Sequence, residues 1–196
     1  MSDINLDREH TSLLIGDCYA DAMTKLSHST SRRCVEKTVA LREAARKAEL
    51  LICYSATVFR PGYLEINERN KLFAPRKHLG LPAASDPVAL IHPALKPDDG
   101  EPVVSKHRVN AFFGTDLEII LSANHVNTLI LVGYATSGVI LSTTRYAADA
   151  DYRVIVVEDC CTDRDAAVHD FLCQKIFPFQ ADVVQSADLI RALSVR

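Results

Sequence analysis

The segment Thr128–Thr143 constrains the fold more than any other part of the sequence. It begins with the apolar run Thr128-Leu-Ile-Leu-Val, which is typical of a buried strand, and then enters a turn at Gly133. A helix is expected to begin near Thr136 or Ser137, directly after this turn. A strand, a turn and a helix in this order present backbone N–H groups at the carboxyl edge of a sheet, where carboxylates and oxyanions are readily held.

Strand-like and helix-like segments alternate along the chain, which indicates parallel strands joined by crossover helices. The strand at 50–56 is mostly apolar without alternation, as expected where helices cover both faces of a sheet. We therefore predict an α/β fold, a Rossmann-like three-layer α/β/α sandwich with a six-stranded, mainly parallel sheet, in a single domain over residues 1–196. The predicted strands are 12–17, 50–56, 102–106, 128–135, 153–158 and 181–185, and the predicted helices cover about 31–49, 115–124, 136–150, 165–177 and 188–193. A capping box at Thr115–Glu118 and an N-cap within Thr162–Asp165 are expected to open two of these helices.

Composition argues against several classes of function. A chain of 196 residues can bury a substantial core without disulfides, and a net charge of −3 gives no reason to expect a nucleic-acid partner. No apolar run approaches the roughly 20 residues that span a membrane, and the N-terminus lacks a signal-peptide pattern, so we expect a cytoplasmic protein. The six cysteines show no C-x-x-C spacing and are interpreted as reduced thiols.

The segment 57–101 breaks the alternation of strands and helices. It holds six of the eight prolines and shows little periodicity, and it is far longer than the usual connection of roughly 4–6 residues. A connection of this length is typical of a lid, a wall of a substrate pocket or a contact between subunits.

Polar residues follow three of the predicted strands at the edge where open parallel sheets bind their ligands. Asp17 ends the first strand, Lys106 ends the third, and Gly133–Val139 follows the fourth. An Asp in such a place is often only a helix cap or an ion-pair partner, but three independent segments at one edge predict a functional pocket. A carboxylate beside an ammonium group stays ionised unless burial desolvates it, and this balance decides whether Asp17 acts as a base or an acid.

Four stretches of the sequence resemble the isochorismatase-like hydrolase superfamily, which includes cysteine hydrolases such as nicotinamidases. They are Leu13-Leu-Ile-Gly-Asp17, Ser105-Lys-His-Arg-Val-Asn-Ala-Phe-Phe-Gly-Thr-Asp116, Gly133-Tyr-Ala-Thr-Ser-Gly-Val-Ile-Leu-Ser-Thr143 and Asp159-Cys-Cys-Thr-Asp-Arg-Asp165. The resemblance implies that Asp17 accepts a proton from a nucleophilic Cys, while Lys106 supports the charged pair. It also implies an oxyanion or substrate contact from Tyr134, Ala135 and Gly138, with a Tyr134–Ala135 peptide bond that is often cis in relatives.

The sequence departs from that family at the position of the nucleophile. Six residues after Gly133 the chain carries Val139, which has no heteroatom and cannot attack a carbonyl. Relatives of the nicotinamidase type carry an Asp and His cluster after the second strand, whereas this chain has no such ligand set there, so neither a metal nor another cofactor is expected. Cys18 and Cys160 lie near the same edge and are the remaining candidates for a nucleophile.

Two further residues are candidates for substrate contacts. Arg60 follows the second strand, and its guanidinium suits a substrate carboxylate, although a salt bridge that holds the long segment is an equal alternative. Of Phe112 and Phe113, one is expected to form a pocket wall and the other to enter the core; Phe112 is taken as the wall.

Three functions remain open from the sequence. The first is a hydrolase of a small metabolite that uses Asp17 and Lys106 without a cysteine, as true isochorismatases of this superfamily do when they protonate a vinyl ether. The second is a catalytically silent member that binds a small molecule or takes part in assembly, and the third is a cysteine amidohydrolase that uses Cys18 or Cys160. A small-molecule substrate is the expected partner, and relatives suggest a homodimer or homotetramer.

Overall fold

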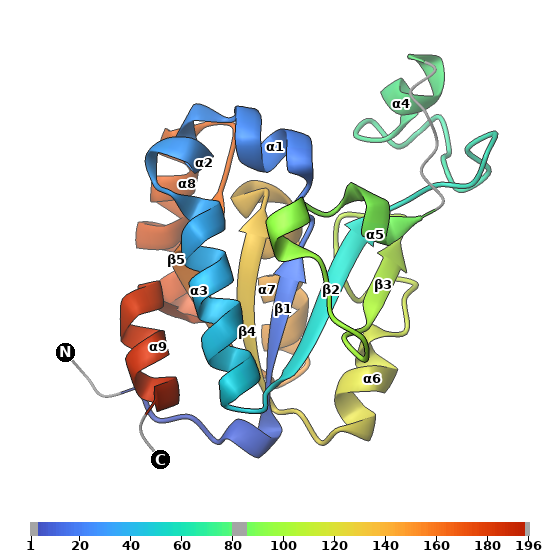
Figure 1. Cartoon of the computed structure of the whole chain (residues 1–196). Coiled ribbons are helices and arrows are strands. Elements are labelled where there is room, and N and C mark those ends of the chain that lie inside the picture. The colour runs from blue at the N-terminus through green and yellow to red at the C-terminus, as the bar shows by residue number, and fades with distance from the viewer. Residues whose placement is uncertain (1–3, 80–85, 195–196) are drawn as a thin grey trace.

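The computed structural model describes residues 4–79 and 86–194 of the chain, and Figure 1 shows how they are arranged. A single sheet of six strands lies at the centre, with the order β3-β2-β1-β4-β5-β6. Every pair of neighbouring strands in it is parallel, which confirms the predicted α/β fold. The strands are β1 (Thr11–Gly16), β2 (Leu51–Thr57), β3 (Val103–Lys106), β4 (Thr128–Tyr134), β5 (Arg153–Thr162) and β6 (Asp182–Val184).

Helices cover both faces of this sheet, so that the molecule has three layers (Figure 1). The α-helices of the described residues are α1 (Ala20–Lys25), α2 (Ser27–Ser31), α3 (Cys34–Lys47), α4 (Ala74–His78), α5 (Pro87–Leu90), α6 (Leu117–Ala123), α7 (Leu141–Asp149), α8 (Ala166–Phe171) and α9 (Ser186–Ser194). Shorter helical turns are η1 (Arg8–His10), η2 (Pro93–Leu95), η3 (Thr136–Ile140), η4 (Leu172–Ile176) and η5 (Phe177–Phe179). Nowhere in residues 4–79 and 86–194 is there a helix with the length and apolar character needed to cross a lipid bilayer.

Side chains that alternate along the strands pack into two separate cores, one on each face of the sheet. On one face Leu13 and Ile15 pack with Leu41 of α3 and Leu189 of α9. On the other face Leu14 packs with residues of α6, α7 and the segment after α8, including Leu117, Leu121, Ala147 and Leu172. A strand that must bury both of its faces has no polar alternation, which explains the uninterrupted apolar runs in the sequence.

The structure corrects two predicted boundaries. Strand β5 continues to Thr162, four residues beyond the predicted end at Glu158, so its polar last residues still belong to the sheet. The predicted capping box before α6 is wrong, because Asp116 takes the N-cap position and makes no side-chain cap. The Thr115 hydroxyl instead accepts the N–H of Leu117 at 3.3 Å.

Residues 58–79 form a separate projection, which we call the arm. It leaves the sheet at the end of β2 and extends away from the body of the molecule (Figure 1). The arm has a small core of its own, built from Phe59, Tyr63, Ile66, Phe73 and Ala74. The predicted long irregular segment is therefore folded here, and its aromatic side chains pack mainly on one another.

Candidate functional site

The register of the sheet brings the three predicted segments to one place. Gly16 lies opposite Gly133 of β4 on one side and opposite Ser55 of β2 on the other. Two residues further along β2, Thr57 lies opposite Lys106 of β3. Asp17, Lys106 and the turn after Gly133 are therefore neighbours at the carboxyl edge, as the sequence indicated.

Asp17 and Lys106 form a buried ion pair at this edge. The Lys106 Nζ donates to Asp17 Oδ2 at 2.6 Å, and the two residues are only 1% (Lys106) and 7% (Asp17) exposed. The same ammonium group also donates to the Thr57 hydroxyl at 2.6 Å and to the Arg108 carbonyl at 3.2 Å. All three N–H bonds of the ammonium group thus have an acceptor, which fixes its position.

Tyr19 completes the environment of the carboxylate, and sequence reasoning did not identify it. Its hydroxyl donates to Asp17 Oδ1 at 2.7 Å and accepts the backbone N–H of Thr57 at 2.7 Å. Asp17 itself has a left-handed backbone with φ of 50°, so the usual alternation of a strand does not hold beyond it. The spacing of two residues between Asp17 and Tyr19 therefore indicates a contact between them only when the turn at Asp17 is already known.

Burial shifts both members of the ion pair toward their neutral forms. Desolvation raises the pKa of Asp17, and it outweighs the opposing effects of the Lys106 charge and of the hydrogen bonds from Lys106, Tyr19 and Thr57. Desolvation likewise lowers the pKa of Lys106 against the stabilising charge of Asp17. A proton shared between these groups is consequently held more readily on the carboxyl than it would be in water.

The turn after β4 lies directly beside the pair and has an unusual backbone. The Tyr134–Ala135 peptide bond is cis, and Gly133 has φ of 135°. A Cβ at position 133 would lie 1.9 Å from the Gly16 carbonyl oxygen, so only glycine fits. The Gly138 N–H donates to the Ala135 carbonyl at 2.9 Å, which uses the donor that we had expected to face an oxyanion.

Asp163 stabilises the turn after β4 through a hydrogen bond to its backbone. Its carboxylate accepts the Ser137 N–H at 2.7 Å, and it is 5% exposed. Asp163 belongs to the stretch in which an N-cap is predicted, and the prediction is confirmed by Asp165, which caps α8 by accepting the Ala167 N–H at 2.9 Å. One acidic stretch therefore serves two helical turns.

Val139 occupies the position at which the resemblance implies a nucleophile. Its side chain is 2% exposed, and a Cβ built on Gly16 would lie 3.2 Å from one of its methyl groups. The isopropyl group therefore fills the space that the glycine leaves open on β1.

The six cysteines are free and buried. Cys18 and Cys160 lie in the core beneath α3, as does Cys34, whereas Cys53, Cys161 and Cys173 lie in the other core. Burial raises the pKa of all six thiols, to about 11 for Cys53 and to about 12 for Cys34 and Cys173. A thiol of this kind holds its proton at neutral pH and is a poor nucleophile.

Two candidate substrate contacts have other partners in the structure. The Arg60 guanidinium pairs with Glu65 at 2.6 Å and is 69% exposed, so it braces the arm as the alternative reading proposed. Phe112 is buried, and its ring stacks on Tyr146 with 4.6 Å between the centroids. We therefore assign Phe112 to the core instead of a pocket wall, while Phe113 is exposed.

Arg164 is a cation at the site that the sequence analysis did not single out. Its Nε donates to the Tyr134 hydroxyl at 2.9 Å, and its side chain is exposed. A guanidinium has further N–H groups besides Nε–H, and they are suited to a carboxylate. Its place in the Asp159–Asp165 stretch was the only signal in the sequence.

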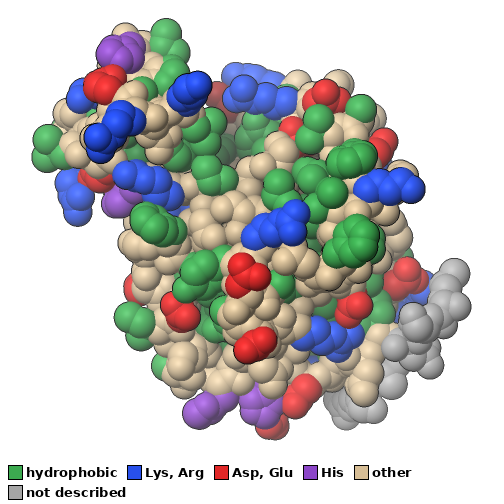
Figure 2. All heavy atoms as spheres, turned by 180° about the vertical axis from the view of Figure 1, so that it is seen from behind, with side chains coloured by type: hydrophobic (Ala, Val, Ile, Leu, Met, Phe, Trp, Pro, Cys, Tyr) green, Lys and Arg blue, Asp and Glu red, His purple; other side chains and the backbone are tan. Residues whose placement is uncertain are grey.

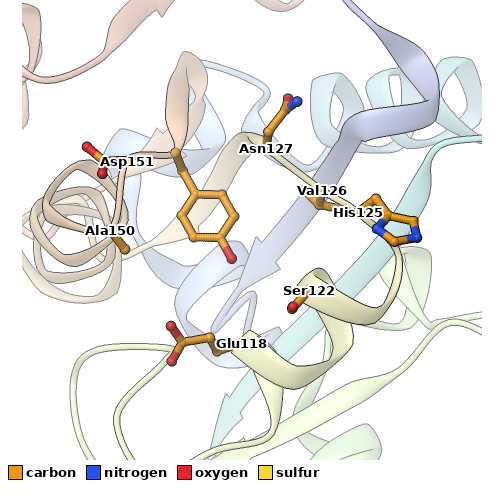
Figure 3. Close-up of a pocket in the computed structure, with 8 residues that line it drawn as sticks. Glu118, Ser122, His125, Val126, Asn127, Ala150 and Asp151 are labelled. Carbon is orange, nitrogen blue, oxygen red and sulfur yellow. The ribbon is translucent and has the colours of Figure 1, made fainter.

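A hollow lies at the opposite edge of the sheet, where β4 and β5 begin (Figure 3). It is lined by Glu118, Ser122, His125, Val126, Asn127, Ala150, Asp151 and Tyr152. None of these residues comes from the segments that carry Asp17, Lys106 or the cis peptide. We therefore place the candidate chemistry at the carboxyl edge.

Comparison with known proteins agrees with this geometry. The family model described as the isochorismatase domain matches residues 11–188. A solved structure of an isochorismatase family protein from Burkholderia thailandensis superposes with a TM-score of 0.84 at 28% identity, and the match covers 99% of this chain and 100% of that one.

Two curated relatives are named as amide-cleaving enzymes. Maleamate amidohydrolase from Pseudomonas putida is 36% identical over 108 residues, which are 55% of this chain and 51% of that protein. N-carbamoylsarcosine amidase from an Arthrobacter species is 30% identical over 151 residues, which are 74% of this chain and 57% of that protein. The chain thus spans only about half the length of the curated relatives it matches.

Proposed function

Because the chain belongs to the isochorismatase family, we propose that it is a hydrolase of a small metabolite that bears a carboxylate or an amide, and that it lacks the family's cysteine nucleophile. The observation that carries the proposal is the buried Asp17–Lys106 pair beside a turn whose nucleophile position is Val139. Asp17 and Lys106 are the proposed catalytic residues.

Asp17 acts as the general acid in this proposal. Its raised pKa keeps a proton on the carboxyl closer to neutral pH, as a general acid requires. A vinyl ether suits this chemistry: the Asp17 proton moves to the alkene carbon, an oxocarbenium-like cation forms, and water adds to that cation. The hemiketal then breaks into a carbonyl compound and an alcohol, and the proton released from water returns to Asp17.

Lys106 and Tyr19 stabilise Asp17 after it has given up its proton. Each donates a hydrogen bond to one carboxylate oxygen, at 2.6 Å and 2.7 Å. The resulting anion lies beside the turn where the cationic intermediate develops, so its charge stabilises that intermediate. This role uses no thiol.

Arg164 is the proposed contact for a substrate carboxylate. Its exposed guanidinium is held at the turn by the Tyr134 hydroxyl, whereas Arg60 is engaged by Glu65. The names of the relatives, which refer to maleamate and N-carbamoylsarcosine, support a small substrate with amide or carboxylate groups.

A turnover screen tests the proposed function. Vinyl ethers, amides and small esters are offered to the wild-type protein, to Asp17→Asn and to Val139→Cys. Turnover by the wild type that vanishes in Asp17→Asn, and that thiol-alkylating reagents leave intact, is the expected result. Loss of wild-type turnover on alkylation would overturn the proposal in favour of a thiol enzyme that uses Cys18 or Cys160.

The alternative is a family member that binds a small molecule without converting it. The replacement of a nucleophile by Val139, packed against Gly16, favours this reading. It predicts a silent wild-type protein that still binds small carboxylates, and amide turnover that appears only in Val139→Cys. That pair of results would contradict the hydrolase proposal.

We also propose that the arm contacts a second copy of the chain. Leu64, Leu72 and Leu79 are 82%, 63% and 71% exposed, and the arm carries five Lys and Arg residues against two Glu. Figure 2 shows these basic side chains on the projecting arm. The whole chain has a net charge of −3, so the body is acidic and complements the arm of another copy.

The free, buried thiols support a reducing, cytoplasmic location.

A further inference from the structure

Two histidines and an aspartate meet behind the cis peptide turn. His28 comes from α2, and His169 and Asp170 come from α8. One possible ligand atom from each of the three lies within 4.8 Å of the other two. The imidazole rings of His28 and His169 face each other edge to face, with 4.7 Å between their centroids. The residues are far apart in the sequence, so only the fold brings them together.

Both ring nitrogens of His169 have a hydrogen-bond partner, and one of the two contacts is long and weak. His169 Nδ1 lies 2.8 Å from the Thr136 hydroxyl, and Nε2 lies 3.7 Å from Cys173 Sγ. In the tautomer in which Nδ1–H donates to Thr136, Nε2 accepts the weakly bonded Cys173 thiol, and an ion bound to Nε2 would take the place of that thiol contact.

His28 has the same arrangement on the other side of the cluster. Its Nδ1 lies 3.1 Å from the Thr162 hydroxyl and accepts the Asp163 N–H at a longer 3.4 Å. Ligation through Nε2 requires the tautomer in which Nδ1–H donates to Thr162, and this tautomer gives up the weaker contact with the Asp163 N–H. Histidine ligands commonly donate their second nitrogen to an oxygen in this way, which fixes the ring.

Charged side chains surround the cluster. Arg32 pairs with Glu158 at 3.1 Å. Asp163 contacts His28 through its backbone N–H, and its carboxylate accepts the Ser137 N–H of the turn. Asp170 is the exposed member of the cluster and faces solvent, from which an ion can enter.

We propose that His28, His169 and Asp170 form a binding site for a divalent transition-metal ion, with Zn²⁺ as the best match. Two imidazole nitrogens and one carboxylate oxygen are ligands that Zn²⁺ takes, with a fourth position left for water. Zinc bonds of about 2.0–2.2 Å place tetrahedral ligand atoms roughly 3.4 Å apart, so a spread of up to 4.8 Å requires a small closure of α2 toward α8. The ion would tie these two helices together behind the turn.

The test is metal binding by the full-length protein, measured without any substrate. Metal-free protein is titrated with Zn²⁺ by calorimetry, and Co²⁺ is used as a spectroscopic probe of tetrahedral coordination. The expected result is one ion per chain, a rise in the melting temperature, and visible Co²⁺ bands. The variants His28→Gln and Asp170→Asn, both at partly or fully exposed positions, should weaken binding roughly tenfold or more.

His125→Ala is the matched control, because it removes an exposed histidine outside the cluster. It should bind Zn²⁺ as the wild type does. Equal binding by His28→Gln, Asp170→Asn and His125→Ala would overturn the proposal, as would less than one ion in ten chains at saturating Zn²⁺. Unchanged folding of His28→Gln is checked by its circular dichroism, so that lost binding is not mistaken for lost structure. This outcome is independent of turnover and leaves the proposed hydrolase function to its own test.

Discussion

At the carboxyl edge of the sheet, polar side chains are buried and paired, whereas the arm keeps most of its charges and all three of its leucines in solvent. The edge is set by the strand register, in which Gly16, Gly133 and Ser55 lie side by side. The arm is held by a few aromatic contacts around Phe59 and by surface ion pairs such as Arg60–Glu65. The difference indicates that the edge tolerates almost no change, while the arm is free to vary in sequence and in what it contacts.

Glycine substitutions give the largest contrast between the two regions. Gly133→Ala should abolish folding or cost more than about 4 kcal/mol, because the new Cβ would lie 1.9 Å from the Gly16 carbonyl oxygen. Gly62→Ala in the arm should cost only about 1–2 kcal/mol, because φ is +83° but no atom lies within 4 Å of the new Cβ. Urea unfolding measures both. Equal losses would show that backbone conformation, and not the close approach of β1 and β4, sets the requirement for glycine.

Removal of the buried carboxylate should be the next largest effect. Asp17→Asn leaves Lys106 buried without a counter-charge, so we expect a loss of about 3–5 kcal/mol in stability and of roughly 10²–10⁴-fold in turnover. The double variant Asp17→Asn with Lys106→Met should recover most of the stability and none of the activity. Asp21→Asn is the control, since it breaks only the exposed Asp21–Lys25 pair. Recovery of activity in the double variant would exclude Asp17 as the general acid.

The pH dependence of turnover should move when Tyr19 loses its hydroxyl. That hydroxyl stabilises the charged form of Asp17 and so lowers its pKa against the effect of burial. A general acid works in its protonated form, so the rate falls as pH rises through this pKa. Tyr19→Phe should raise the pKa further and shift the falling limb of kcat/KM to higher pH, whereas Tyr152→Phe should leave it in place. A shift to lower pH would contradict the assignment of Asp17 as the acid.

The residues at the carboxyl edge can be predicted from the sequence as well as the ends of the strands can. Uninterrupted apolar runs located the strands, and the order of parallel strands placed Asp17 and Lys106 together. Tyr19 was missed because the positive φ of Asp17 redirects the chain, and no periodicity reveals such a turn. The His28–His169 contact was missed because it joins two short helices that are distant in the sequence.

The arm was not predictable in the same way. Its turns and prolines gave no period from which a face could be assigned, and its core consists of only five residues. The choice of Arg60 as a substrate contact followed from its place after β2, but Glu65 lies five residues further on and takes the guanidinium. Local pairing of this kind depends on the path of a loop, which the sequence pattern does not determine.

The proposed contact between the arm and a second copy of the chain is tested by measuring dimerisation. Leu64→Ser combined with Leu72→Ser should weaken dimerisation about tenfold or more if these side chains are buried between copies. The stability of the monomer should hardly change, because both leucines are exposed in the single chain. Analytical ultracentrifugation measures the dissociation constant. Ile119→Ser on α6 is a matched change of another exposed aliphatic side chain, and a loss confined to that variant would move the contact from the arm to α6.

The smallest expected effect concerns the two arginines that compete for the role of substrate contact. Arg60→Gln breaks an exposed ion pair with Glu65 and should cost less than about 1 kcal/mol in stability. Its KM should stay at the wild-type value, because the guanidinium is already occupied. Arg164→Gln should instead raise KM for substrates that carry a carboxylate and leave KM for uncharged analogues unchanged. A rise in KM for Arg60→Gln alone would mean that the arm closes over the substrate. The contrast between a fixed edge and an arm that takes no part in binding would then fail.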